Sequence, residues 1–180
     1  MAILTVITEP DPRLHICSEE VAEVTDDIRH FMDDMLETMY HSEGIGLAAV
    51  QVGVHKRIIV MDIDHSQERY ENDGSGQGRP LCMVNPTIVA SSEEENIYQE
   101  GCLSFPGQFA KVIRPKEVTI EYLDYDGEKQ TLHCTGLLAT CVQHEIDHIN
   151  GVVFVDHLSK LKREMILRKL KKSKQLDDEA

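Results

Sequence analysis

Residues 136–149 constrain the fold more than any other segment, because they predict a helix whose buried face includes histidines. Four residues at spacings of i, i+4, i+7 and i+11 share one face of this helix: Leu137, Cys141, His144 and His148. This stripe begins with apolar residues, so we expect both histidines to point into the protein interior. Buried imidazoles need polar partners, and a metal ion is a suitable one.

The rest of the chain predicts an α+β domain of short antiparallel strands packed around that central helix, with another helix at the C-terminus. Apolar residues at helical spacing predict a helix over residues 25–40, with Thr25 as its N-cap. A C-terminal helix is expected to begin near Leu158. Apolar and β-branched runs, with a turn at Asp126-Gly127, predict strands over residues 57–63, 83–84, 87–90, 112–114, 117–125 and 128–134.

We expect residues 1–180 to form a single domain, since neither a repeat nor a linker interrupts the pattern. Within it, residues 158–180 are expected to form a basic C-terminal helix and tail. The polar segment 65–78 contains Asp73-Gly74-Ser75-Gly76 and predicts a surface loop.

The composition excludes several classes of protein. Hydrophobic residues make up 41% and charged residues 28% of the 180 residues, as in ordinary globular domains. No apolar run reaches about 18 residues, so we expect no membrane span. The first ten residues lack a signal region, which leads us to expect a cytoplasmic protein. Five scattered cysteines argue against a disulfide framework and leave thiols for metal binding or catalysis.

The charge is unevenly distributed along the chain. The net charge of −14 disfavours general nucleic-acid binding. Residues 160–174, however, contain eight Lys or Arg and one acid, Glu164, and so carry +7 against −21 for the remainder. A basic helix of this kind is most often only a solvated surface.

The helix also contains the pattern His144-Glu145-Ile146-Asp147-His148. Two imidazoles one helical turn apart can bind the same metal ion, which would make this the metal-binding helix. Glu145 lies about 100° around the helix from His144. It can therefore accept a proton from a water molecule whose pKa the metal lowers. The alternative is that both residues are ordinary surface or core histidines, because short patterns also arise by chance.

A catalytic metal site needs a third protein ligand, and this helix does not supply one. The cysteines and the remaining histidines are candidates, among which Cys102 stands out within the segment 100–104. Cys102 could equally be a plain buried thiol.

Residues 44–51 have two interpretations as well. The segment is either a helix-ending turn followed by a buried strand, or a place where small residues admit a substrate backbone beside the Gln51 amide. It is not a phosphate loop, since no Lys-Ser or Lys-Thr follows the glycines.

Three segments together resemble the peptide deformylase family, whose members carry G-x-G-L-A-A-x-Q, E-G-C-L-S and Q-H-E-x-D-H in this order. Here they stand at residues 44–51, 100–104 and 143–148. The resemblance extends over residues 4–170. It implies a metal-dependent hydrolase that removes the formyl group from the N-terminal formyl-methionine of nascent polypeptides and releases formate.

The resemblance also implies roles for individual residues. The implied metal ligands are Cys102, His144 and His148. The native ion in the family is usually Fe²⁺, which Zn²⁺, Ni²⁺ or Co²⁺ can replace. Glu145 would transfer the proton, while the Gln51 amide and the Leu103 backbone N–H would stabilise the oxyanion.

For the substrate, the resemblance implies a slot for the methionine side chain and a surface for the backbone. The residues implied in these contacts are Ile45, Gly46, Leu137 and Cys141. By helix spacing alone, Leu137 and Cys141 could instead only fill the core. In the family the C-terminal helix can dock on the ribosome, so this basic helix is expected to contact ribosomal RNA.

The chain departs from the family pattern at a few positions. Thr140 stands where many bacterial members have an aliphatic residue, and Phe109 stands where many have an Arg that holds the peptide. The loop at residues 65–78 is longer than usual. Two other functions remain compatible with the motifs: a zinc peptidase of the H-E-x-x-H class, and a silent binding protein that kept the fold.

Overall fold

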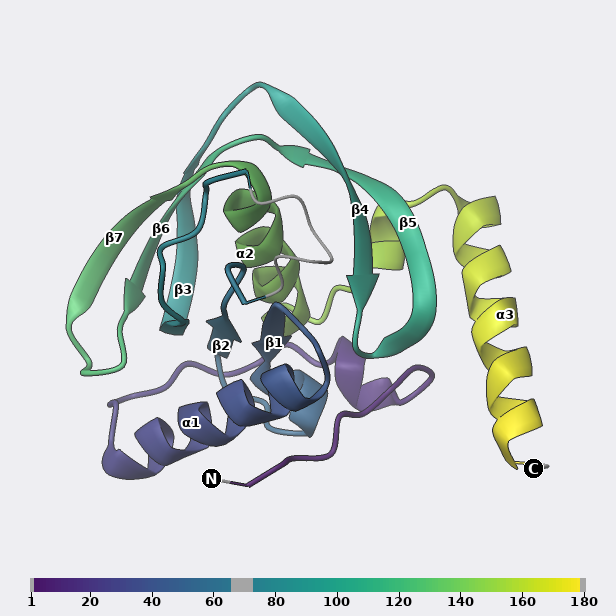
Figure 1. The fold of residues 1–180 in the computed structure, drawn as a ribbon, viewed down its shortest axis with the longest axis horizontal. Coiled ribbons are helices and arrows are strands. Elements are labelled where there is room, and N and C mark those ends of the chain that lie inside the picture. The colour runs from purple at the N-terminus through teal and green to yellow at the C-terminus, as the bar shows by residue number, and fades with distance from the viewer. Residues whose placement is uncertain (1, 66–72, 179–180) are drawn as a thin grey trace.

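The computed structural model describes residues 2–65 and 73–178 and confirms the α+β prediction. Helix α2 (Gly136–Ile149) lies at the centre, and the strands curve around it (Figure 1). Helices α1 (Asp26–His41) and α3 (Lys160–Asp178) lie outside, α1 below the first strands and α3 beside the hairpin of β4 and β5. Short 3-10 helices cover Pro12–His15, Ala49–Val52 and Phe154–His157.

Every strand pair in the described structure is antiparallel, and the strands form two sheets. The larger sheet has the order β1-β2-β3-β6-β7, and the smaller one pairs β4 with β5. The strands are β1 (Gly46–Ala48), β2 (Ile58–Met61), β3 (Leu81–Ser91), β4 (Glu95–Cys102), β5 (Phe105–Pro115), β6 (Val118–Leu123) and β7 (Lys129–Cys134).

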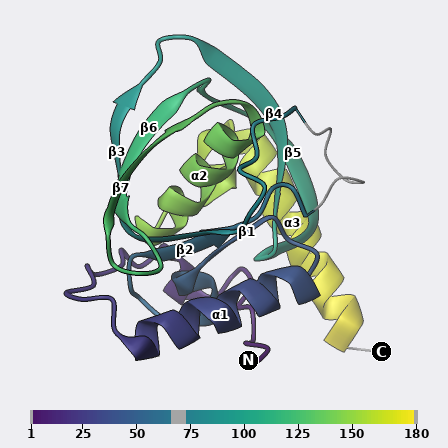
Figure 2. The same ribbon diagram turned by 60° about the vertical axis from the view of Figure 1, so that its left-hand side comes forward.

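Helix α2 is enclosed on almost every side, since all its residues except Gly136 and Asp147 are buried. Figure 2 shows it held inside the curve of the sheets. Its apolar residues pack against the larger sheet, with Ile59 and Ile120 among the contacts. Its buried polar residues, such as His144, therefore need partners inside the protein.

Two further apolar clusters fix the outer helices. Helix α1 packs on the larger sheet through Met32, Met35 and Met39, which are fully buried. Helix α3 places Ile166 and Leu170 against the cluster around Phe105 and Phe154. The N-cap of α1 is Thr25, as predicted, and its side chain accepts a hydrogen bond from the Ile28 backbone N–H.

The sequence predicted several elements less well. The strands predicted at 83–84 and 87–90 are one long strand, β3, with irregular register. The strand predicted at 112–114 extends to eleven residues, and β4 was not predicted because polar residues dominate it. The predicted loop 65–78 is described only at residue 65 and from 73 onward. Among the described residues, no helix is both long and apolar enough to cross a membrane.

Candidate metal centre

Three potential metal ligands meet where the end of β4 contacts α2. The ligand atoms of Cys102, His144 and His148 all lie within 4.8 Å of one another. The Cys102 Sγ lies 3.2 Å from His148 Nε2, which lies 3.1 Å from His144 Nε2. The structure therefore brings together the mid-chain thiol and the two histidines that the sequence singled out.

Glu100 determines the orientation of the first histidine. Its Oε1 atom lies 2.8 Å from His144 Nδ1, so this nitrogen donates its proton to the carboxylate. The other ring nitrogen, His144 Nε2, then faces Cys102 and His148. A carboxylate in this place is the usual outer partner of a metal-binding histidine.

The same carboxylate begins a polar chain, buried at Glu100 and Arg114, that the sequence analysis missed. Arg114 donates to both Glu100 oxygens, at 2.7 and 3.0 Å, and its other nitrogen donates to Asp147 at 2.8 Å. His157 reaches the same Asp147 oxygen at 2.7 Å. The only available sequence signal was an unexplained acid beside Cys102 and another inside the histidine motif.

The two histidines differ in protonation. Burial lowers the pKa of His148 well below its ordinary value, and nearby His144 adds to the effect. Burial acts in the same direction on His144, but hydrogen bonds to Cys102 and Glu100 outweigh it and raise the pKa of His144. A cation between the rings would take the place of the proton that His144 holds.

Glu145 is a buried acid beside the centre. Its side chain is 4% exposed, and its Oε2 atom has no hydrogen-bond partner within the described residues. Burial raises the pKa of Glu145 to about 7. A Cβ atom at Gly46 would collide with this carboxylate, so glycine there makes room for the acid as well as for any substrate.

Gln51 is held with its amide nitrogen towards the centre. Its Oε1 accepts the Ala48 backbone N–H at 2.9 Å, which fixes the direction of the amide. Its Nε2 then donates to Ser104 Oγ at 3.1 Å and lies 3.5 Å from Cys102 Sγ. The sequence alone gave no reason for this fixed orientation.

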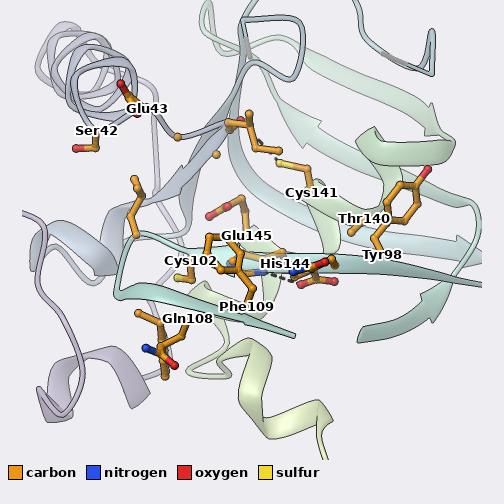
Figure 3. A pocket seen from close by; sticks show the side chains of 18 of the residues that line it. Ser42, Glu43, Tyr98, Cys102, Gln108, Phe109, Thr140, Cys141, His144 and Glu145 are labelled. Carbon is orange, nitrogen blue, oxygen red and sulfur yellow. Dashed lines mark hydrogen bonds and ion pairs between the residues drawn. The ribbon is translucent and has the colours of Figure 1, made fainter. Parts of the chain in front are cut away.

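A pocket opens above the centre and contains all the residues that the resemblance implied for substrate binding. They are Ile45, Gly46, Leu137 and Cys141. Leu103, Glu145 and Gln51 also line it. Figure 3 shows Cys102, His144 and Glu145 together, with Ser42 and Glu43 on one side and Tyr98 and Thr140 on the other.

The departures from the family pattern lie at the rim of the pocket. Phe109 is 48% exposed and pairs with Gly101 across the β4-β5 ribbon. A Cβ atom at Gly101 would collide with the Phe109 ring, so the ring covers Gly101, the residue before Cys102. Thr140 also lines the pocket and is 6% exposed.

The residues at the centre fit a divalent transition metal. One thiol and two imidazoles provide the three protein ligands of a catalytic site, and this donor set suits Fe²⁺, Zn²⁺, Ni²⁺ and Co²⁺. His148 is neutral, and His144 already has an outer carboxylate partner. Both features are expected of metal-binding histidines.

A family profile described as "Polypeptide deformylase" matches residues 3–164. The chain belongs to the peptide deformylase family. The predicted resemblance is confirmed, and this family membership decides against the peptidase alternative. Peptide deformylases act as metal-dependent hydrolases, and the cluster of Cys102, His144 and His148 could hold such a metal ion.

Relatives and solved structures agree along almost the whole chain. The peptide deformylase of Pelagibacter ubique is 51% identical over 174 residues, covering 97% of this chain and 96% of the relative. The crystal structure of peptide deformylase from Ehrlichia chaffeensis has a TM-score of 0.90 at 47% identity, covering 98% and 99% of the two chains. A second Ehrlichia chaffeensis structure, in complex with actinonin, has a TM-score of 0.88 at 50% identity, covering 96% and 98%.

Proposed function

We propose that this protein removes the N-formyl group from the formyl-methionine of nascent polypeptides, with one divalent metal ion held by Cys102, His144 and His148. The proposal is supported chiefly by the convergence of these three ligand atoms within 4.8 Å, next to a pocket that Cys102 and His144 line. Glu145, beside them, is the candidate for proton transfer.

The bound metal would lower the pKa of a water molecule and polarise the formyl carbonyl. Glu145 then accepts the proton of the attacking water and returns it to the leaving amine. A carboxyl pKa of about 7 suits both steps near neutral pH, and a cation close by would lower it somewhat.

Two hydrogen-bond donors are proposed to stabilise the oxyanion that forms on the formyl carbon. The Gln51 amide nitrogen is already held near Cys102, so it needs no reorientation during the reaction. The Leu103 backbone N–H, in the turn after β4, is the second donor. Removal of one such donor typically costs about 100- to 1,000-fold in rate.

The substrate is proposed to enter with its methionine side chain between Ile45, Leu137 and Cys141. Its backbone would follow Gly46 in β1 and the strand segment after Ser104, adding a strand between the two sheets. Because Gly46 has no side chain, it leaves space in this part of the pocket beside Cys141 and Glu145.

We assign Fe²⁺ as the native ion, on the resemblance to the family, with Zn²⁺, Ni²⁺ or Co²⁺ able to replace it. Elemental analysis of protein purified without oxygen tests the assignment. Iron should predominate in that preparation and should decline after exposure to air, because ferrous iron beside a thiolate is oxygen-sensitive. A preparation rich in zinc and fully active under both conditions would contradict it.

Helix α3 is proposed to contact ribosomal RNA from the cytoplasm. Its exposed cations include Lys162, Lys169, Lys171 and Lys172. Ile166 and Leu170 pack in the core, which supports a single domain over residues 1–180 and makes deletion of the helix a poor test. Replacing the four exposed lysines with Gln should weaken ribosome binding and leave activity on short formyl-peptides unchanged. Unchanged ribosome affinity would refute the contact.

A formate-release assay tests the main proposal. The metal-loaded protein should release formate from formyl-Met peptides. It should not cleave internal peptide bonds, and it should leave unformylated peptides intact. If no formate is released although metal is bound, the protein has kept only the fold and acts as a binding protein.

A further inference from the structure

Alternate residues of β4 face helix α2 and form a seam along the pocket. In a strand, residues two apart lie on the same face, about 6.6 Å from each other. Four helical residues rise about 6 Å, so every second residue of β4 can face every fourth residue of α2. Cys102 meets His148, and Glu100 meets His144. The next residue on this face of the strand is Tyr98.

At Tyr98 the seam is joined by a residue from elsewhere in the chain. The Tyr98 hydroxyl donates to Asp73 Oδ2 at 3.0 Å, and the Leu137 backbone N–H donates to the same oxygen at 2.8 Å. Asp73 belongs to the segment between β2 and β3. A single carboxylate oxygen therefore connects β4 to the first turn of α2.

The start of α2 is adapted to receive this segment. Thr135 occupies the N-cap position without making a side-chain cap bond. Asp73 and Ser75 supply the missing acceptors instead, since Ser75 Oγ accepts the Leu138 N–H at 3.2 Å. Gly136 has φ +54°, and a Cβ atom there would collide with the Asp73 carboxylate. The helix thus begins with a residue that leaves room for the loop.

Electrostatics favour the same contact. A negative charge is stabilised at the N-terminus of a helix by the unpaired backbone N–H groups. Burial opposes ionisation of Asp73, but hydrogen bonds from Ser75, Leu137 and Tyr98 outweigh it and lower its pKa. The carboxylate is therefore ionised at neutral pH.

Both partners of Asp73 line the substrate pocket. Tyr98 belongs to the β4 wall and Leu137 to the α2 wall. Figure 3 shows Tyr98 beside Thr140, on the side of the pocket away from Ser42 and Glu43. The metal end of the seam is held by the ligands and by Glu100, whereas the outer end depends on the Asp73 contact.

We propose that Asp73 is a positioning residue for deformylation, which sets the distance between β4 and α2 at the outer end of the pocket and thereby selects the first side chain of the substrate. The inference rests on the proposed function. Without this contact, Tyr98 and the first turn of α2 can separate, and the pocket then accepts bulkier side chains. The chemical step is affected little, because the metal end is held separately.

The test compares Asp73→Ala with the wild-type metal-loaded enzyme on formyl-Met and formyl-Phe peptides. Asp73 is exposed, so its replacement leaves no core cavity and the variant should fold. The KM for the formyl-Met peptide should rise about tenfold, the scale of one hydrogen bond to a charged group. The kcat should change less than about threefold, and the preference for Met over Phe should fall.

Two companion variants separate positioning from helix capping. Ser75→Ala removes the bond to the Leu138 N–H but keeps the Asp73 contacts with Leu137 and Tyr98. It should therefore lower the melting temperature and change KM and the preference for Met far less than Asp73→Ala does. Asp73→Asn keeps an oxygen that accepts from both Leu137 and Tyr98, and it should restore most of the wild-type KM.

Tyr98→Phe tests the coupling between the two walls. It should reproduce the loss of preference seen in Asp73→Ala, and the double variant should add nothing further, because both changes break the same contact. If Asp73→Ala lowers only the melting temperature, as Ser75→Ala does, Asp73 is a helix cap and the inference is wrong. If wild-type protein releases no formate, the proposed function itself has failed.

Discussion

The two ends of the seam between β4 and α2 are built in different ways. At the metal end, Cys102, Glu100 and the two histidines of α2 are buried or nearly so and contact one another directly. At the outer end, the Tyr98 hydroxyl is joined to the first turn of α2 through Asp73, an exposed residue from a distant loop. The candidate metal-binding residues are thus fixed by buried contacts with one another, while the outer end of the pocket depends on a few surface contacts.

This difference predicts which substitutions should alter the rate of the reaction and which should alter substrate selectivity. Buried polar groups are costly to leave unpaired, so a change at the metal end should affect the rate, metal binding and folding. Changes at the outer end remove contacts that water can replace. They should mainly affect which peptides bind.

The largest effect is expected from Glu145→Gln, which keeps the shape of the side chain and removes the proton acceptor. The kcat should fall by about 100- to 10,000-fold, the range of general acid–base catalysis. Metal content should stay near that of the wild type, since Glu145 is not among the three clustered ligands. Formate release and elemental analysis on the same sample check both statements.

The matched control for that variant is Glu121→Gln, on the exposed face of β6. It should have wild-type kcat. Loss of bound metal in Glu145→Gln would contradict a role in proton transfer alone.

A large effect on stability is expected from Arg114→Met, because it leaves Glu100 and Asp147 without their shared cation. Removing one partner of a buried ion pair typically costs about 3–5 kcal/mol. Metal affinity should also fall by about 10- to 100-fold, as it does when the outer partners of metal ligands are changed. Denaturant unfolding and chelator competition measure these quantities.

Lys116→Met is the control for Arg114→Met, since the Lys116–Glu94 pair lies just beyond the end of the same ribbon and is exposed. It should change the free energy of unfolding by about 1 kcal/mol or less. If both substitutions lower the free energy of unfolding equally, the buried Arg114 pairs contribute no more to stability than the exposed Lys116 pair.

A smaller effect is expected of pH on the contribution of Glu100 to the free energy of unfolding. Burial would raise the pKa of Glu100, but hydrogen bonds from His144 and Arg114 outweigh it and lower the pKa to about 2. A carboxyl with a lowered pKa stabilises the fold above its ordinary pKa, and this contribution is lost as pH falls towards 2. The difference in unfolding free energy between wild type and Glu100→Gln should therefore shrink below about pH 4.5. A constant difference across this range would contradict the contact.

The smallest effect is expected at the rim of the pocket. Phe109→Ala removes an exposed ring that covers Gly101, and it should raise the KM for peptides with an apolar residue after the methionine by about fivefold or less, the equivalent of about 1 kcal/mol. Peptides with acidic residues there should be unaffected. A large fall in kcat would show that Phe109 has a direct part in the chemistry.

The sequence predicted the metal end of the seam better than the outer end. Helix α2 was placed at its observed bounds, because glycines stand at its start and just after its end and its inward stripe begins with apolar residues. The proposed metal ligands are rare residue types in short motifs, so the sequence could single them out as candidates. The order and the antiparallel pairing of the strands could be expected only in outline.

The remaining features depend on contacts between distant residues. Strand β4 is polar because its inward face meets a polar centre, and hydrophobic alternation therefore could not reveal it. The contact of Asp73 with Leu137 joins residues 64 positions apart, and the Asp147–His157 contact joins α2 to the 3-10 helix after it. No local pattern encodes such pairings.

The most direct test of the whole account is the metal content of Cys102→Ala beside that of the wild type and Cys134→Ala, all purified without oxygen. Cys134 is a buried thiol in β7 outside the cluster, so its variant controls for the loss of any cysteine. We predict about one metal ion per chain in wild type and Cys134→Ala, and a strong reduction in Cys102→Ala, since one of three protein ligands is removed. Equal metal content in all three proteins, or none in the wild type, would contradict the account.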